Sequence, residues 1–189
     1  MPVAASYDAL VRRTTAVLAA AVLLLGAGLV WLVRAAPLEA GSYFFCGRYE
    51  IANQGRSCIV EYHDGRDFLW AFSIRNRGPF GVTVTGVVAP DGGLIRAAEL
   101  LMWPRNGVEA FDEAAFVPFA PFPLPAGEER VIAYVARFDG CEDYVGTASA
   151  TIGRVEVRFR LLGVPRGEET ELLRTVEVPA PEDCPGRQV

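Results

Sequence analysis

The sequence predicts an all-β fold, an antiparallel β-sandwich, preceded by one transmembrane α-helix. Two observations predict it. A strongly apolar, uncharged run lies near the N-terminus, and beyond it apolar residues recur with the period of two that half-buried strands show. Glycine- and proline-rich turns separate these strands at sandwich-like spacing. We therefore expect a cytoplasmic segment over 1–13, a transmembrane helix over 14–34, a linker over 35–41 and an extracytoplasmic sandwich over 42–189.

The apolar run extends from Thr14 to Val33 and is bounded by Arg13 and Arg34. As a helix, twenty residues span about 30 Å, the thickness of the hydrocarbon core of a bilayer. Trp31 lies near one end, where indole rings favour the membrane interface. A cleaved signal peptide is an alternative, although its apolar region is usually shorter, about 7–15 residues. A buried core helix is a further alternative.

The arginines around this run favour an N-terminus inside the cell. Arg12 and Arg13 precede it, whereas only Arg34 follows closely, and positive charge concentrates on the cytoplasmic side. The chain is thus expected in the cell membrane as a single-pass protein with its C-terminal domain outside. That domain is acidic. Residues 1–34 carry three arginines and one aspartate, a net charge of +2, and because the whole chain has a net charge of −5, the remainder has a net charge of −7. Nucleic acid is therefore not an expected partner.

Four cysteines, all beyond the apolar run, indicate an oxidising compartment and two disulfides. Three pairings are possible. We favour Cys46–Cys58, which flanks one short connection, and Cys141–Cys184, which would attach the C-terminal tail to a loop. The sequence has no CxxC motif, so a redox site or a zinc ribbon is not indicated.

Strands are expected where apolar and polar residues alternate or where β-branched and aromatic residues cluster. His63-Asp64-Gly65-Arg66 reads as a hairpin turn between two of them. Residues 96–102 (RAAELLM) also fit a short helix. The expected strands are 58–62, 67–76, 82–88, 130–138 and 154–161, with weaker ones near 94–103 and 170–178.

Two stretches resemble known sequences. FSIRNRGPFGVTVTGV, residues 72–87, resembles the strand–turn–strand of bacterial immunoglobulin-like domains, and PFPLPAGEERVIAYVARFDGC, residues 121–141, resembles the turn and strand of membrane-anchored sandwiches. Together they resemble membrane-anchored immunoglobulin-like proteins of high-GC bacteria. The resemblance implies an immunoglobulin-like sandwich and carries no site residues.

Catalytic chemistry is not indicated, and we expect neither an enzyme nor a bound cofactor. His63 is the only histidine and falls at a turn, so a nucleophile has no obvious base. No phosphate-binding glycine loop is present. If Cys141 pairs with Cys184, one set of acids would converge around that disulfide and supply the oxygen ligands that calcium prefers. This low-ranked calcium cluster consists of Asp139, Glu142, Asp143, Glu182 and Asp183.

The segment 111–125 combines four phenylalanines with four prolines. Proline excludes it from an interior strand. Its phenylalanines either plug one end of the sandwich or form an exposed strip, Phe116, Phe119 and Phe122, that docks on a protein partner or on the lipid surface. The sequence favours a non-enzymatic binding or accessory subunit of a membrane or envelope component. A structural envelope protein without a tight partner is the alternative, and a metal carrier or enzyme ranks last.

Overall fold

The computed structural model describes residues 15, 17–28, 30, 36–89, 93–105, 107, 112–141, 149–182 and 184. The chain divides into two compact units, Met1–Ala36 and Pro37–Val189. The first contains helical residues 17–28, whose apolar side chains are exposed, Leu25 to 75%. Nowhere in the described chain does a helix combine the length and the apolar character that a membrane crossing requires. Residues 1–14, 16, 29 and 31–35, which include parts of the expected cytoplasmic segment, helix and linker, lie outside the described residues.

The second unit is built from strands and one short 3-10 helix, η1 (Glu113–Ala115). The strands are β1 (Leu38–Phe45), β2 (Glu50–Gln54), β3 (Ser57–Val60), β4 (Asp67–Asn76), β5 (Val82–Val88), β6 (Ile95–Met102), β7 (Val117–Pro118), β8 (Phe122–Leu124), β9 (Glu129–Phe138), β10 (Ser149–Leu161) and β11 (Val164–Pro179).

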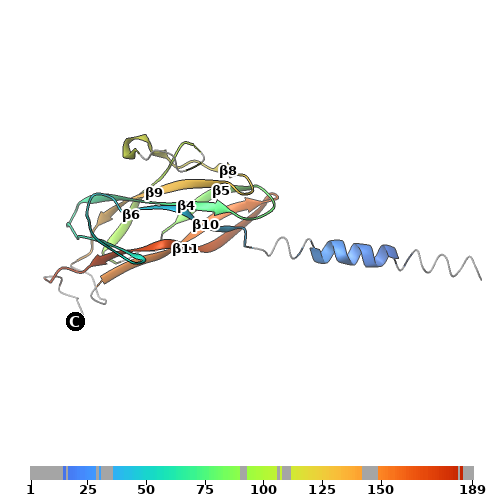
Figure 1. The fold of residues 1–189 in the computed structure, drawn as a ribbon, viewed down its shortest axis with the longest axis horizontal. Helices are drawn as coiled ribbons and strands as arrows, with labels where there is room; N and C mark the ends of the chain where they lie inside the picture. Colours follow the sequence, from blue (N-terminus) through green and yellow to red (C-terminus); the bar gives the residue numbers. More distant parts are fainter. Residues whose placement is uncertain are drawn as a thin grey trace, which may run out of the picture. The chain divides into compact units, whose positions relative to one another are not determined.

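These strands form two sheets, which confirms the all-β sandwich. One has the order β1-β4-β9-β6-β7 and the other β2-β3-β11-β10-β5-β8. Figure 1 shows β4 and β9 in one layer and β10 and β11 in the other. The described pairings are antiparallel except that of β3 with β11, which is parallel. The expectation of a wholly antiparallel sandwich is therefore wrong at this pair.

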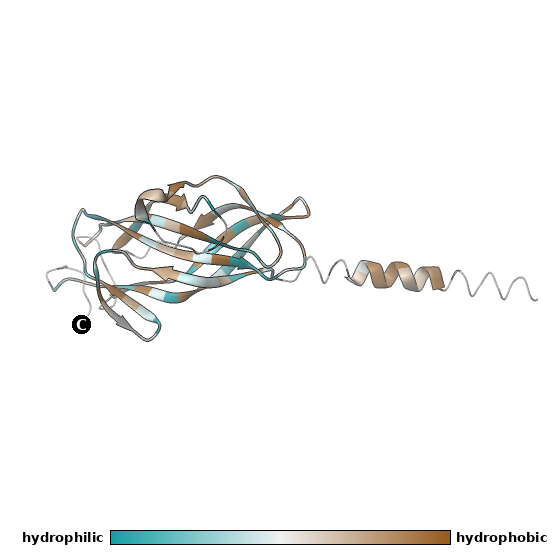
Figure 2. Cartoon of the chain, turned by 45° about the horizontal axis from the view of Figure 1, so that its top comes forward, coloured by the Kyte–Doolittle hydropathy of each residue, from teal (hydrophilic) through white to brown (hydrophobic). Residues whose placement is uncertain are grey.

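The core lies between the sheets, where buried apolar residues of both sheets form one cluster. Figure 2 shows hydrophobic residues along the strands of both sheets. Trp70 of β4 stacks on Tyr134 of β9 at a ring-centroid distance of 5.2 Å. The opposite sheet contributes Val157 and Phe159, both fully buried. Cores of interlocked aromatic and β-branched side chains hold sheets face to face about 10 Å apart.

Three sequence-based expectations are corrected here. The short helix considered over 96–102 does not form, and these residues belong to strand β6, in agreement with the weaker strand expected near 94–103, because pairing with β9 outweighs local helix preference. The linker ends earlier than expected, since β1 begins at Leu38. His63 to Arg66 form a turn, in which the Arg66 nitrogen donates to the His63 oxygen, but the strands on either side lie in different sheets, so the turn does not close a hairpin.

Both favoured disulfides are confirmed. Cys46 is bonded to Cys58, and Cys141 is bonded to Cys184. The first joins the end of β1, in one sheet, to β3 in the other. The second holds the segment after β11 against the segment after β9. Each disulfide therefore links chain segments that backbone hydrogen bonds do not hold together in a ladder.

Candidate functional site: an arginine-lined hollow at the β10–β11 bulge

A local mismatch between β10 and β11 lies beside a hollow in the described surface. Ile152 pairs with Val176, but the next paired residue, Arg154, lies opposite Glu171. Residues 172–175 of β11 therefore face the single residue Gly153 of β10. Such bulges bend a strand and redirect its side chains, and they are frequent near functional sites.

The sequence permits this bulge at one glycine. A Cβ atom at Gly153 would lie 2.8 Å from Cγ2 of Thr175, closer than carbon atoms pack. Thr175 is in turn held by β3, because its backbone nitrogen donates to the Arg56 oxygen at 2.8 Å and its hydroxyl lies 3.1 Å from that of Ser57. The parallel β3–β11 pairing thus fixes one wall of the hollow.

The hollow has a volume of about 270 Å³ and a basic lining. Its lining includes three arginines and one glutamate, in a molecule whose net charge is −5. Arg154 donates to Glu171 at 3.1 Å, and Glu169 lies 3.9 Å from Arg154. The lining residues are Arg56, Gly153, Arg154, Glu171, Leu172, Leu173, Arg174 and Thr175.

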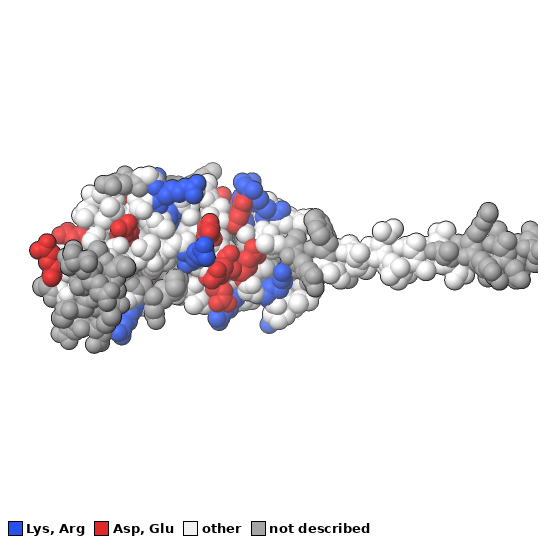
Figure 3. Space-filling view, turned by 90° about the horizontal axis from the view of Figure 1, so that it is seen from below, with Lys and Arg blue, Asp and Glu red and all other residues white. Residues whose placement is uncertain are grey.

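This lining suits an acidic group attached to an apolar neighbour. Guanidinium groups bind carboxylates and phosphates through two parallel hydrogen bonds, and exposed Leu173 offers apolar contact beside them. On the face seen from below in Figure 3, basic and acidic side chains alternate and do not form a field of one sign. Recognition here would therefore depend on local geometry more than on long-range attraction.

The phenylalanine strip is largely packed inside the domain. Phe122 is only 3% exposed and lies under the guanidinium group of Arg130, 4.6 Å from ring centroid to Cζ. Phe119 packs edge-on against Phe122, and Phe116 against Trp103 on the outer face of the β4–β9 sheet. Phe122 is therefore inaccessible to a partner, whereas Phe116 and Phe119 are half-buried. Phe111 lies outside the described residues.

The acids of the expected calcium cluster are described only in part. Asp139 forms an ion pair with Arg96 at 3.4 Å, and Glu182 is exposed. Neither belongs to a group of three metal-ligating side chains within the described part of the chain. Glu142, Asp143 and Asp183 lie outside the described residues.

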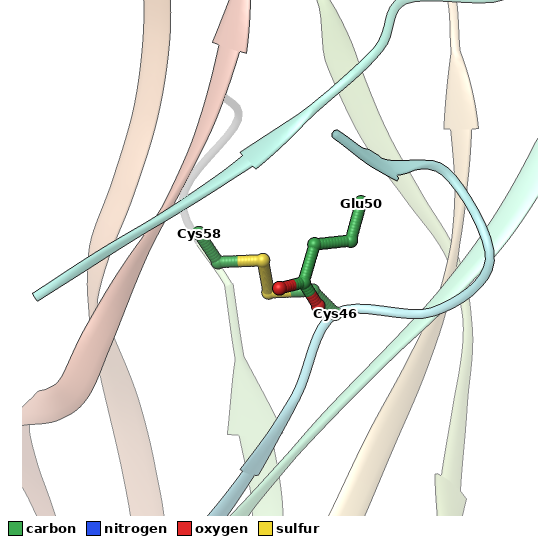
Figure 4. A group of neighbouring side chains, drawn as sticks. All are labelled: Cys46, Glu50 and Cys58. Atoms are coloured by element: carbon green, nitrogen blue, oxygen red, sulfur yellow. A yellow bond between two sulfur atoms is a disulfide. The ribbon is translucent and has the colours of Figure 1, made fainter. Parts of the chain in front are cut away.

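Another group does bring ligand-type atoms together. Cys46, Glu50 and Cys58 place a carboxylate oxygen and two sulfurs within 4.8 Å of one another (Figure 4). The sulfurs are bonded to each other, however, and metal binding needs thiolates. The group is therefore a disulfide beside a carboxylate and not a metal centre. His63 has a structural environment, with its ring 4.5 Å from that of Tyr49 and Nε2 3.2 Å from Glu61.

Sequence reasoning missed the hollow entirely. Arg56 lies at a turn nearly a hundred residues before Arg154, and Arg174 lies on the next strand, so nothing local in the sequence connects the three. Only the register shift and the parallel pairing bring them together. A glycine within an otherwise alternating strand, Gly153, was the one signal that could have indicated a bulge.

No protein-family model and no curated protein matches the chain. Some solved structures are similar in part. The Vibrio cholerae VesB protease has a TM-score of 0.33 at 10% identity, over 66% of this chain and 30% of its own. PapD-like domain 7 of human CEP192 has a TM-score of 0.33 at 9% identity, over 68% of this chain and 83% of its own. A non-cellulosomal cohesin from the archaeon Archaeoglobus fulgidus has a TM-score of 0.32 at 9% identity, over 76% of this chain and 91% of its own. At TM-scores this low, these likenesses assign neither a family nor an activity.

Proposed function

We propose that this protein is a membrane-anchored extracytoplasmic binding subunit whose immunoglobulin-like sandwich holds an acidic segment of a protein partner in the arginine-lined hollow. The observation that carries the proposal is the convergence of Arg56, Arg154 and Arg174 around one cavity of an otherwise acidic molecule. Arginine is enriched where proteins recognise carboxylates, because its planar donor array is fixed in advance.

The location rests on the N-terminal segment and the cysteines. Residues 14–33 carry no charge, and the helical residues 17–28 expose leucine and valine side chains, as a lipid-embedded helix would. Paired disulfides persist in oxidising spaces outside the cytoplasm. The uncharged run therefore serves as a retained anchor, with the N-terminus inside and the sandwich outside.

The partner is a protein rather than a small molecule. The hollow is lined mostly by residues of two strands, and its lining includes Leu172 and Leu173 as well as three arginines, so a carboxylate with an apolar neighbour fits it best. A segment bearing Asp or Glu beside Leu or Val has this chemistry. Binding needs no cofactor and involves no covalent step.

The test uses the full-length protein in lipid nanodiscs and a fluorescent peptide in which Glu and Leu alternate. We expect the peptide to bind and its affinity to fall with added salt. Arg154→Gln and Arg174→Gln should each weaken binding roughly tenfold, since a charge-assisted hydrogen bond contributes about 1.5–3 kcal/mol. The matched control is Arg137→Gln, because Arg137 is also exposed and paired with an acid, Asp67, but lies on the other sheet.

Purification from native membranes provides the second readout. A companion protein should copurify with the wild type and with Arg137→Gln, and be lost from the Arg154→Gln, Arg174→Gln double variant. If the double variant binds peptide and companion as well as the wild type does, the hollow is not the binding site. Extraction of the protein by alkaline carbonate would contradict the membrane anchor separately.

A further inference from the structure

The turn between β10 and β11 lies at the end of the sandwich where the chain enters it. Leu38, the first residue of β1, pairs with Asn76. The side chain of Asn76 donates to the Leu124 oxygen, Leu124 pairs with Val82, and Val82 pairs with Leu161. This series of contacts connects the start of β1 to the end of β10, and Figure 1 shows both at one end of the domain.

This end exposes three large apolar side chains, which we call the apolar tip: Phe80, Leu162 and Val164. They are 39%, 58% and 49% exposed, respectively. Phe80 precedes β5, Leu162 lies in the turn that connects β10 to β11, and Val164 is the first residue of β11. A single exposed apolar residue needs no explanation, but three at one end of a domain mark an interaction surface.

The backbone shows that Leu162 occupies an unfavourable position. Its φ is 52°, the one positive value of a non-glycine among the described residues, and it is followed by Gly163 at 83°. Two-residue turns with two positive φ angles favour Asn-Gly, since leucine in this region brings its Cβ close to the backbone. An apolar side chain retained here at a backbone cost suggests a use for that side chain.

The length of chain before the sandwich restricts what this surface can meet. Four positions separate Val33, the last residue of the uncharged run, from Pro37, where the sandwich unit begins. A chain of four residues spans at most about 14 Å. If the run is anchored in a bilayer, as proposed above, the end bearing the apolar tip is therefore held next to the lipid headgroups.

Arginines flank the apolar tip. Arg160, near the end of β10, is exposed, and Arg166, near the start of β11, is partly buried. Arginine places its hydrocarbon stem along apolar surface and its charge among headgroups, so this pairing suits the boundary between headgroups and acyl chains.

We infer that the apolar tip inserts into the lipid interface of the membrane that holds the N-terminal segment. The inference rests on the proposed anchor. Arg154 lies seven residues before Leu161, so at the rise of a strand the arginine-lined hollow lies about 23 Å along β10 from the tip.

The experiment uses full-length protein reconstituted into lipid vesicles, with a polarity-sensitive fluorophore on Leu162→Cys. Thr151→Cys is the matched control, because Thr151 is exposed on the same hairpin, about 33 Å along β10 from Leu161. The native cysteines are all in disulfides and so do not react. Lipids carrying a nitroxide at the top of the acyl chain should quench the label at 162 and shift its emission to the blue, and should leave the label at 151 unchanged.

A second variant separates lipid contact from folding. Leu162→Asn suits the positive φ better than leucine, so its melting temperature should equal or exceed that of the wild type. A label on Val164→Cys should nevertheless lose part of its quenching when combined with Leu162→Asn.

The outcomes distinguish the two proposals. If the protein stays in the vesicles after alkaline carbonate and the labels at 162 and 151 are equally unquenched, the inference is overturned while the anchor stands. Protein that leaves the vesicles would overturn the anchor itself.

Discussion

The carboxylate of Glu129 accepts hydrogen bonds from both the backbone nitrogen and the hydroxyl of Ser42, at 2.6 and 2.9 Å. The two residues lie on strands that do not touch in the ladder, since β4 separates β9 from β1. A register shift between Ala40 and Phe44 accompanies this contact, and the Ser73 hydroxyl of β4 donates to the same oxygen. Glu129 thus fastens the edge strand β1 to a strand in the interior of its sheet.

The ionised form of Glu129 should stabilise the fold. Burial opposes ionisation, but hydrogen bonds from Ser73 and Ser42 outweigh it and hold the pKa of Glu129 below its usual range. A lowered pKa gives stability that is complete above the unfolded value, about 4.3, and is lost as the pH falls through the folded value. We expect Glu129→Gln to lower the free energy of unfolding by about 1–2 kcal/mol near neutral pH and by less in acid.

Urea unfolding across this pH range measures the difference. Glu128→Gln is the control, because Glu128 is exposed next to it in the chain. If Glu129→Gln lowers the free energy of unfolding by the same amount in acid as at neutral pH, the charge of Glu129 does not have this role.

Gly41 leaves the space that the Glu129 carboxylate occupies. A Cβ at this position would overlap a carboxylate oxygen of Glu129 and the hydroxyl of Ser73. Gly41→Ala should therefore destabilise the domain about as much as Glu129→Gln, and the double variant should be little worse than either, since both remove one interaction. Gly86→Ala, where a Cβ meets no atom within 4 Å, serves as the control. Additive losses in the double variant would show that the two positions act independently.

Asn76 holds three backbone segments together from a fully buried position. Its Nδ2 donates to the oxygens of Phe80 and Leu124 at 2.8 and 2.9 Å, and its Oδ1 accepts from the nitrogen of Gly78 at 2.9 Å. Asn76→Ala leaves these groups without that partner, which should cost about 3 kcal/mol or more of unfolding free energy. Denaturant unfolding measures this cost. Thr151→Ala, at an exposed position, should cost far less, and an equal loss in both variants would refute the assignment.

The two disulfides should differ in their contribution. They close sequence separations of 12 and 43 residues. Loop-closure entropy predicts about 3 kcal/mol for Cys46–Cys58 and about 4 kcal/mol for Cys141–Cys184. We expect the Cys141→Ala, Cys184→Ala double variant to unfold at lower urea concentration than the Cys46→Ala, Cys58→Ala double variant. The reverse order would mean that the local environment, and not loop length, determines the effect.

The sequence predicted the strands that have clean local patterns and missed those that tertiary contacts define. Residues 154–161 alternate strictly and fall within β10, and 67–76 match β4. The first half of β1 fell within the expected linker. Its pairing with β4 shifts register between Ala40 and Phe44, where the Glu129 carboxylate lies beside Gly41, so β1 lacks the regular alternation that marks a strand. Residues 94–103 were expected as a weaker strand although 96–102 also fit a short helix, and pairing with β9 decides for the strand.

The favoured cysteine pairing was predictable because short separations and the position of the tail left few sensible choices. The arginine-lined hollow was not predictable. A register shift depends on which residues of β11 skip pairing, and nothing in the composition of residues 171–176 specifies that. The burial of Phe122 depends equally on Arg130, whose guanidinium group is held by the Trp103 and Pro104 oxygens.

The parallel pairing of β3 with β11 also determines the order in which the domain can assemble. It joins residues 57–59 to residues 175–177, so nearly the whole length of the domain must be available before that sheet can close. Contacts this distant in sequence slow folding, because the intervening loop must be ordered first. The arginine-lined hollow, which depends on the same pairing, therefore forms among the last features. A chain still being synthesised therefore lacks the arginine-lined hollow until residue 177 is in place.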